Sequence, residues 1–265
     1  MMAIFIPICI YSGTIIFNIA MSALSLIAVY EMISCVGAKK NIPVVISSCI
    51  LGALMPMIPY FTSEFTLHIE MMCYIVYMIL VFTFTVFSRG ESDFATVSAA
   101  FMGVFYISVS FTSIILLRKT GEYLYLLAFF GPWVSDTFAY IVGRLIGKRK
   151  LIPEVSPNKT IAGSVGGIIA TAALFVGYGF AVAKLAELSS TPNVIAMAVA
   201  GAIVSVISQI GDLTASYIKR RYGVKDYGKL FPGHGGVMDR FDSVLLTAPV
   251  LYIISELPMV QGMLI

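Results

Sequence analysis

Residues 194–217 read VIAMAVAGAIVSVISQIGDLTASY, an apolar stretch in which Asp212 is the only charged residue. A helix needs about 20 predominantly apolar residues to cross the hydrocarbon core of a bilayer, so this stretch predicts a membrane-spanning helix. An ionised Asp at bilayer depth costs roughly 2.5–3.5 kcal/mol, and residues of this kind mark functional polar sites. We therefore expect Asp212 to belong to a membrane-embedded site that holds a metal ion or a cation-bound phosphate group.

The composition of the whole chain agrees with this interpretation. Of its 265 residues, 59% are hydrophobic and 12% are charged, whereas soluble domains are nearer 25% charged. The mean hydropathy of +0.95 predicts an all-α, polytopic integral membrane protein that forms a single membrane domain over residues 1–265. The apolar runs are continuous rather than alternating, which argues against a β-barrel. We expect about nine transmembrane helices, at 1–12, 14–36, 43–60, 68–87, 95–117, 124–146, 164–186, 194–217 and 241–260.

The basic residues are distributed unevenly over the connections between these segments. Connections 37–42, 88–94, 147–163 and 218–240, together with Arg144, hold 14 of the 17 Lys and Arg residues. The positive-inside rule places these connections and the N-terminus in the cytoplasm. We expect a protein of the cell's inner (plasma) membrane with its site facing the cytoplasm. Nucleic acid is not an expected partner, because the basic residues adjoin spans and lack a soluble module.

Several common sequence features are missing. The four cysteines (Cys9, Cys35, Cys49 and Cys73) lie in apolar stretches without C-x-x-C spacing, so they read as small buried hydrophobic residues. The N-terminus lacks a basic region and a small-residue cleavage site, so no cleavable signal peptide is expected. The chain also lacks the P-loop, dinucleotide-binding and H-E-x-x-H patterns.

The densest set of polar residues runs from Ser205 to Asp242. Asp212 and Asp239 supply hard oxygen ligands that suit Mg²⁺, and they lie at the facing ends of consecutive spans, so we expect them to converge. The cationic residues could hold phosphate oxygens, and the glycines let backbone N–H groups approach a phosphate. These residues are Lys219, Arg220, Lys225, Lys229, Gly228, Gly233, Gly235 and Gly236. Each residue also has an ordinary structural explanation, such as a membrane anchor at 219–221 or a helix-dipole partner at Asp239.

The stretch from Ser216 to Asp242 resembles the phosphatidate cytidylyltransferase (CDP-diacylglycerol synthase) family. It satisfies every fixed position of that family's motif, S-x-φ-K-R-x₄-K-D-x-G-x₂-φ-P-x-H-G-G-φ-x-D-R-φ-D, where φ is apolar. Residues 136–148 and 156–163 resemble two earlier blocks of the family, D-x-x-A-Y…G-R…G-K and S-P-x-K-[ST]-x-E-G. Ala162 stands where the family usually has Glu, which weakens any role for a carboxylate there.

The resemblance implies a nucleotidyltransferase of phospholipid biosynthesis that makes CDP-diacylglycerol and pyrophosphate from CTP and phosphatidic acid. It implies Mg²⁺ as cofactor, held by Asp212 and Asp239, with a second cation, divalent or K⁺, as a further candidate. The expected catalytic residues are Asp212, Asp239, Lys219, Arg220, Lys225, Asp226 and His234. The expected substrate-binding residues are Asp136, Lys159, Ser216, Lys229, Gly235, Gly236, Arg240 and Asp242. Residues 124–265 would then form the catalytic half, and residues 1–120 would mainly be scaffold.

Two other functions fit parts of this pattern. A CTP-dependent lipid-alcohol kinase would release CDP instead of pyrophosphate, and an ion-coupled transporter would use Asp136 and Asp212 as coupling sites. Gly143-x-x-x-Gly147 favours helix packing over ligand binding. Glu31 is expected to reach the membrane interface, and neither Glu31 nor Glu70 is given a catalytic role. Only the resemblance suggests a homodimer.

Overall fold

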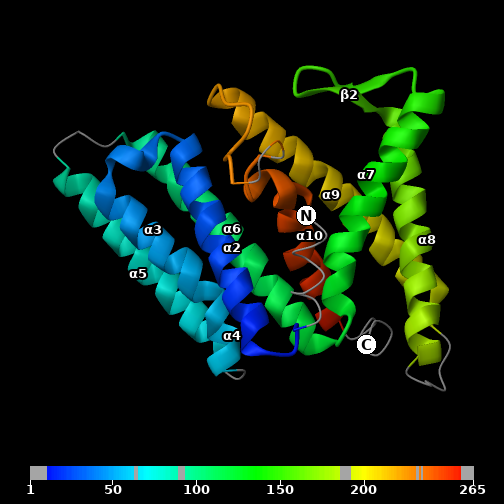
Figure 1. Ribbon diagram of the computed structural model, residues 1–265, viewed down its shortest axis with the longest axis horizontal. Coiled ribbons are helices and arrows are strands. Elements are labelled where there is room, and N and C mark those ends of the chain that lie inside the picture. Colours follow the sequence, from blue (N-terminus) through cyan, green and yellow to red (C-terminus); the bar gives the residue numbers. More distant parts are fainter. Residues whose placement is uncertain are drawn as a thin grey trace. The chain divides into compact units, whose positions relative to one another are not determined.

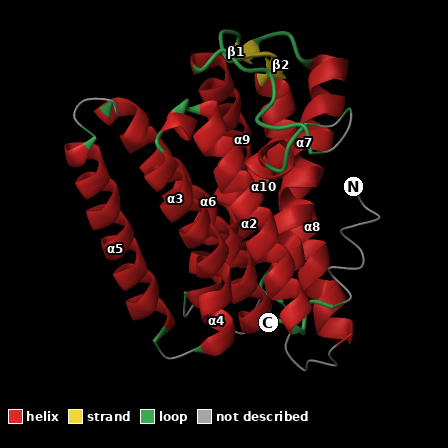
Figure 2. Cartoon of the chain, turned by 60° about the vertical axis from the view of Figure 1, so that its left-hand side comes forward, coloured by secondary structure: helices red, strands yellow, loops and turns green. Residues whose placement is uncertain are grey.

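The computed structural model describes residues 11–62, 65–88, 93–185, 192–230, 233 and 235–257. Helices dominate these residues, as Figures 1 and 2 show. The long helices are α2 (Ile15–Cys35), α3 (Ile42–Leu54), α5 (Thr66–Phe87), α6 (Phe94–Thr120), α7 (Leu127–Ile146), α8 (Ile161–Leu185), α9 (Val194–Arg221) and α10 (Met238–Glu256). The short ones are α4 (Ile58–Phe61) and the 3-10 helices η1 (Ala38–Lys40), η2 (Met55–Met57) and η3 (Leu124–Leu126).

Seven helical stretches among the described residues are long and apolar enough to cross a membrane. They are 15–35, 42–61, 66–87, 94–120, 124–146, 161–184 and 194–221, and they confirm an all-α, polytopic membrane protein. Of the predicted first segment, 1–12, only residues 11 and 12 are described. The predicted last segment forms α10, whose first turn carries Asp239 and Arg240, followed by Asp242.

Four of the long helices begin where a short polar side chain caps the first turn. Thr14 accepts a hydrogen bond from the backbone N–H of Ile16 (3.3 Å), and Asn41 accepts one from Val44 (3.3 Å). The carboxylate of Asp93 and the amide oxygen of Asn193 play the same role for α6 and α9, at 3.1 Å each. The first N–H groups of a helix have no intrahelical partner, so these caps set where the apolar helices start.

The connection after α7 forms an antiparallel hairpin that the sequence analysis did not predict. Strand β1 (Lys150–Ile152) pairs with β2 (Ser156–Thr160), with Lys150 opposite Thr160 and Ile152 opposite Ser156. Two such short strands, with Pro157 inside the second, carry a weak periodic signal, so the sequence could not identify them. The hairpin leads directly into α8 (Figure 1).

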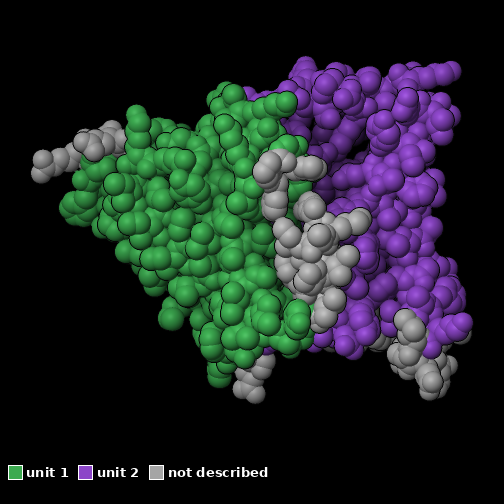
Figure 3. Space-filling model, in the orientation of Figure 1, with its two compact units in different colours: residues 1–116, 221–241 green, residues 117–220, 242–265 purple. Residues whose placement is uncertain are grey.

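The chain divides into two compact units, which Figure 3 shows in green and purple. Unit 1 comprises residues 1–116 and 221–241, and unit 2 comprises residues 117–220 and 242–265. Each unit has its own apolar core: Phe17, Met32 and Phe111 are fully buried in unit 1, and Phe129, Phe175 and Val204 in unit 2. In unit 1, α3 packs against both α2 and α5.

Close approach through glycine organises the helices of unit 2. A Cβ atom added to Gly143 would lie 2.8 Å from the hydroxyl of Thr160, and one added to Gly163 would lie 3.0 Å from it. A Cβ on Gly201 of α9 would lie 2.7 Å from the backbone oxygen of Thr171 in α8. Helices that meet across glycine can bring their backbones close together. The predicted packing role of Gly143 is therefore confirmed.

Of the described cysteines, only Cys35 is fully buried as predicted. Cys35 is buried, Cys49 and Cys73 are half-buried, and all three are free thiols. Cys9 lies outside the described residues. The described cysteines therefore serve as small packing residues.

Candidate functional site

Unit 2 contains a polar cavity of about 260 Å³ enclosed by the hairpin and helices α7, α8 and α9. Its lining residues are Asp136, Ala139, Tyr140, Leu151, Ser156, Asn158, Lys159, Thr160, Ser164, Gln209 and Asp212. The structure thus brings Asp136 and Asp212, which are 76 positions apart in the sequence, to one cavity together with Lys159. Two carboxylates and an ammonium group inside an apolar bundle form a place where charged ligands can be held.

Asp212 is matched by a specific cation in this cavity. Its Oδ2 atom forms an ion pair with Nζ of Lys159, which is the penultimate residue of β2. The side chains of Lys159 and Asp212 are 21% and 27% exposed, so solvent in the cavity screens part of their attraction. The hairpin therefore supplies the opposite charge that lets an apolar helix carry Asp212.

A third carboxylate, Asp242 of α10, belongs to the same cluster. The hydroxyl of Ser243 donates to Oδ2 of Asp136 at 3.3 Å and lies 3.4 Å from Oδ1 of Asp242. Electrostatic interactions link Asp242 to Asp136 and Asp212. A Cβ on Gly211 would lie 2.8 Å from the backbone oxygen of Asp242, so α9 and α10 approach closely at this point. Ser243 was missed by the sequence analysis, although it directly follows the D-R-φ-D motif.

A buried hydroxyl and amide network lies beside the cluster and was also missed. The hydroxyls of Ser135 and Ser205 are 2.7 Å apart, and Nε2 of Gln209 lies 3.3 Å from Oγ of Ser205. Nε2 of Gln209 also donates to the backbone oxygen of Ser164 at 3.3 Å. The available signal was the spacing of Ser205 and Gln209, which puts two polar residues on one face of an apolar helix.

The C-terminal end of α9 carries three predicted site residues with different surroundings. Ser216 lies one helical turn after Asp212 and is half-buried, as is Lys219, whose charge interacts with Asp242. Arg220 is exposed, and its Nε donates to the backbone oxygen of Val155 at 2.6 Å. Arg220 therefore ties the end of α9 to the hairpin, a contact that the sequence did not indicate.

The remaining predicted residues lie in unit 1, in the glycine-rich loop (residues 222–237) and at the start of α10. Lys225, Asp226 and Lys229 are exposed on this loop. Oδ2 of Asp239 accepts hydrogen bonds from the backbone N–H groups of Tyr227 (2.8 Å) and Gly236 (3.0 Å). Asp239 therefore connects Tyr227, within the loop, to the end of the loop at Gly236.

The position of Asp239 also depends on a neighbouring glycine. Gly235 has a φ of +81°, and a Cβ there would meet the Asp239 carboxylate. Asp239 belongs to unit 1 and Asp212 to unit 2, so the convergence of their carboxylates stays a prediction.

Glu31 occupies a different place from the one that the sequence suggested. It was expected to reach the membrane interface, yet its side chain is buried, with 5% of the residue exposed. Its Oε1 accepts a hydrogen bond from the backbone N–H of Val237 (3.1 Å), and its Oε2 accepts one from Met238 (2.9 Å). The expectation was wrong because the unsatisfied N–H groups at the start of α10 provide a buried anion-binding position.

The carboxylates of the unit 2 cavity suit a divalent cation. Carboxylate oxygens are the ligands that Mg²⁺ prefers, and Asp136 and Asp212 present theirs to one cavity. Within the part of the chain that the structure describes, no group of three or more His, Cys, Asp or Glu side chains has metal-binding geometry. A cation held here would therefore take further ligands from substrate oxygens or water. His234 lies outside the described residues.

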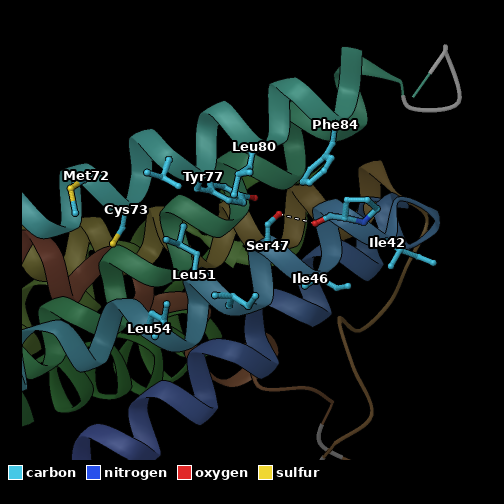
Figure 4. Close-up of a pocket in the computed structure, with 13 residues that line it drawn as sticks. Ile42, Ile46, Ser47, Leu51, Leu54, Met72, Cys73, Tyr77, Leu80 and Phe84 are labelled. Atoms are coloured by element: carbon cyan, nitrogen blue, oxygen red, sulfur yellow. Dashed lines mark hydrogen bonds between the residues drawn. The ribbon is translucent and has the colours of Figure 1, made fainter. Parts of the chain in front are cut away.

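A second, apolar hollow of about 550 Å³ lies between α3 and α5 in unit 1. Figure 4 shows Leu51 and Leu54 of α3 facing it, with Cys73 and Leu80 of α5 on the other side. Ser47, the polar residue on its α3 wall, donates to the backbone oxygen of Pro43 at 2.8 Å (Figure 4). This hollow offers no charged group for chemistry on phosphates.

The chain is similar to known proteins over nearly its whole length. The cytidylyltransferase family matches residues 1–257 of the chain. A phosphatidate cytidylyltransferase from Staphylococcus haemolyticus is 35% identical over 252 residues, which cover 95% of this chain and 94% of that protein. Enzymes of the same name from Staphylococcus saprophyticus and Staphylococcus aureus are 33% and 34% identical, with the same coverage of both chains.

Proposed function

This chain belongs to the cytidylyltransferase family and makes CDP-diacylglycerol from CTP and phosphatidate, and we propose that the residues of the unit 2 cavity and of the glycine-rich loop carry this reaction. The observation that supports this proposal most strongly is the cavity in which Lys159 pairs with Asp212 beside Asp136. The reacting groups then lie in residues 124–265, and residues 1–120 mainly supply the scaffold.

The reaction is nucleotidyl transfer, which replaces one bond at phosphorus by another. A phosphate oxygen of phosphatidate attacks the α-phosphorus of CTP, a new P–O bond forms, and the bond to the β-phosphate breaks to release pyrophosphate. The attacking oxygen is largely ionised near neutral pH, so no strong general base is needed. The main barrier is the repulsion between two polyanions, which positioned cations reduce.

The positions of three cationic side chains support a role in holding phosphate groups. Lys159 lies in the cavity, and Lys219 and Arg220 lie at the end of α9. We propose that these residues, with Lys225 and Lys229 of the loop, hold phosphate oxygens of CTP and phosphatidate. We also assign substrate binding to Asp136, Ser216, Gly235, Gly236, Arg240 and Asp242, and we assign Asp226 and His234 to the reaction, with His234 as a donor to a phosphate oxygen.

We further propose that Asp212 and Asp239 hold Mg²⁺. We also propose that a second cation, divalent or K⁺, takes part in the reaction. When bound, Mg²⁺ would neutralise charge on the triphosphate and on the leaving pyrophosphate. The ammonium of Lys159 pairs with Oδ2 of Asp212, and we propose that it would turn towards a phosphate when substrate binds. The hard oxygens in the cavity support the choice of Mg²⁺.

The protein is an integral membrane protein with seven candidate spans in its described part. We propose that it lies in the cell's inner (plasma) membrane with its N-terminus and active site on the cytoplasmic side. The basic residues of the connections support this orientation. The diacyl chains of the substrate then stay in the lipid, and CTP enters from the cytoplasm. A homodimer also remains a proposal, and the mass of the purified protein in detergent tests it.

The metal proposal is tested with CTP that carries a label on its α-phosphate, together with phosphatidate in detergent micelles. We expect the label to enter the lipid with Mg²⁺ present and to stay in CTP after EDTA, with recovery on adding Mg²⁺ back. Undiminished transfer in EDTA would reject the metal assignment. A lipid-alcohol kinase would leave this label in released CDP, so the same assay separates the two reactions.

A further inference from the structure

We propose that Glu31 of α2 is a positioning residue for cytidylyl transfer, because it holds the glycine-rich loop and the start of α10 in the arrangement that orients Asp239. The proposal deepens the function proposed above, since it rests on the assignment of Asp239 to the reaction. It also gives a specific task to the N-terminal part of the chain. Glu31 touches neither substrate nor cation in this role, and it acts through the loop.

Glu31 of α2 caps the N-terminal end of α10. Both carboxylate oxygens are used, one for the N–H of Val237 and the other for the N–H of Met238, at 3.1 and 2.9 Å. Met238 is the first residue of α10, so these N–H groups lack partners within the helix. The positive end of the helix dipole adds to the attraction.

The loop leaves room for this carboxylate only through glycine. A Cβ atom on Gly228 or on Gly236 would collide with the carboxylate of Glu31. Both glycines therefore bring the loop backbone against the Glu31 carboxylate. A glycine is required where a backbone must approach another group this closely.

Gly236 links Glu31 to Asp239. Its Cα packs against the carboxylate of Glu31, and its N–H donates to Oδ2 of Asp239 at 3.0 Å. Glu31 fixes the backbone at Val237 and Met238, which lie between Gly236 and Asp239. The N–H of Gly236 and the side chain of Asp239 are therefore held close enough to form their hydrogen bond. Loss of the Glu31 carboxylate would therefore move both partners of this hydrogen bond.

The Glu31 carboxylate is held by backbone N–H groups. Neither the ion pair of Arg118 with Glu122 nor that of Lys159 with Asp212, both found among the described residues, involves Glu31. A buried carboxylate that depends on backbone N–H groups is sensitive to the loss of either oxygen. The Glu31→Gln change keeps the shape of the side chain and replaces one acceptor by a donor that faces an N–H group.

The test compares Glu31→Gln with Glu70→Gln in the full-length protein in detergent. Glu70 is the matched control, since it is also a glutamate of a membrane helix in unit 1, it is half-buried, and it makes no hydrogen bond through Oε1 in the described structure. Two quantities are measured: the turnover with its dependence on Mg²⁺ concentration, and hydrogen exchange of peptides from residues 222–241 without nucleotide or metal.

We expect Glu31→Gln to lower turnover by about 10- to 100-fold, the usual effect of removing a group that orients a ligand-binding residue. It should also raise the Mg²⁺ concentration needed for half-maximal turnover and accelerate exchange in the loop. Glu70→Gln should leave all three unchanged. If the loop of Glu31→Gln exchanges hydrogen at the wild-type rate, Glu31 does not hold the loop and the proposal is wrong. If exchange is faster but turnover and Mg²⁺ dependence are unaltered, Glu31 holds the loop without a role in the reaction, which also overturns the proposal. If Asp239→Asn keeps full activity while Glu31→Gln still accelerates exchange in the loop, the assignment of Asp239 to the reaction is wrong, and the contact between Glu31 and the loop stands.

A double-mutant comparison keeps the proposal testable if Glu31→Gln is poorly produced. Gly228→Ala places a methyl group against the Glu31 carboxylate, so it should lower turnover in the wild type and accelerate exchange in the loop. In a Glu31→Ala background the obstacle is gone, and Gly228→Ala should have a much smaller additional effect. Equal effects of Gly228→Ala in both backgrounds would contradict the proposed contact.

Discussion

The two polar centres of this molecule hold their carboxylates in different ways. In unit 1, Glu31 and Asp239 accept hydrogen bonds from backbone N–H groups. In unit 2, Asp212 pairs with the side chain of Lys159, and Asp136 accepts from the side chain of Ser243. A backbone donor moves only if the loop moves, whereas a side-chain donor can turn away when a ligand arrives. The donors of the first centre are therefore fixed with the loop, whereas those of the second can change partner when a ligand binds.

The largest effect should come from the centre that exchanges partners. Asp212→Asn removes one of the two carboxylates that line the cavity, and we expect turnover to fall by at least about 100-fold, as when a key electrostatic group is lost from an active site. Asp239→Asn should do the same if both residues hold Mg²⁺. Transfer of the α-phosphate label into lipid measures the loss, and protein recovered from membranes confirms insertion.

The matched control for Asp212→Asn is Glu154→Gln, an exposed acidic residue in the turn of the hairpin. It should keep full turnover, because it faces solvent and lines no cavity. Most activity surviving in both Asp212→Asn and Asp239→Asn would refute their assignment to the metal.

A smaller loss is expected for the cation that pairs with Asp212. Lys159→Met keeps much of the side-chain volume and removes the charge, and hydrogen bonds to charged groups contribute about 1.5–3 kcal/mol. Turnover at low CTP should therefore fall roughly 10- to 100-fold. Lys150→Met, at an exposed position of the same hairpin, is the control and should change little. Equal effects of the two changes would show that Lys159 acts only through the general charge of the hairpin.

Packing around the cavity should affect stability more than chemistry. A Cβ on Gly147 would collide with the side chain of Thr160 and the backbone oxygen of Gly143, and overpacking costs about 1–3 kcal/mol. We expect Gly147→Ala to lower the Tm in detergent by several degrees. Gly177→Ala, where a Cβ meets nothing within 4 Å, should leave the Tm unchanged or raise it slightly. A similar Tm for both variants would contradict the packing explanation.

The smallest effect is expected at the hydrogen bond between Arg220 and the hairpin. Arg220→Gln removes the donor to Val155, and a single hydrogen bond contributes about 0.5–1.5 kcal/mol, so turnover should fall by a few-fold, up to about tenfold. Arg221→Gln, at the next exposed position, is the control. The change also removes a cation that we propose for phosphate oxygens, so a loss as large as that for Asp212→Asn would show that phosphate binding, and not the hydrogen bond to the hairpin, is the main task of Arg220.

The comparison between units also explains which parts of the site could be predicted. The sequence identified Asp136, Lys159, Asp212 and Asp242 as members of one polar site, and the structure gathers them in unit 2. It missed the network of Ser135 with its serine and glutamine partners, because isolated hydroxyls are common in membrane helices and carry little signal. It also missed the hairpin, whose strands are too short to show a period.

The sequence by itself determined the class of the protein and the types of residue at its site. Continuous apolar segments leave few alternatives to helices, because unpaired backbone groups in lipid cost several kcal/mol each. The spacing from Ser216 to Asp242 was enough to indicate the family, which the full-length relatives confirm.

Only the tertiary structure decided which partner each charged residue has. Lys159 meets Asp212 because the hairpin and α9 meet in unit 2, and Glu31 meets the start of α10 because the glycine-rich loop folds back to α2. Hydropathy depends on composition within one segment, whereas an ion pair or a cap depends on segments that are distant in the sequence. A buried charge must find some partner, and packing selects which one.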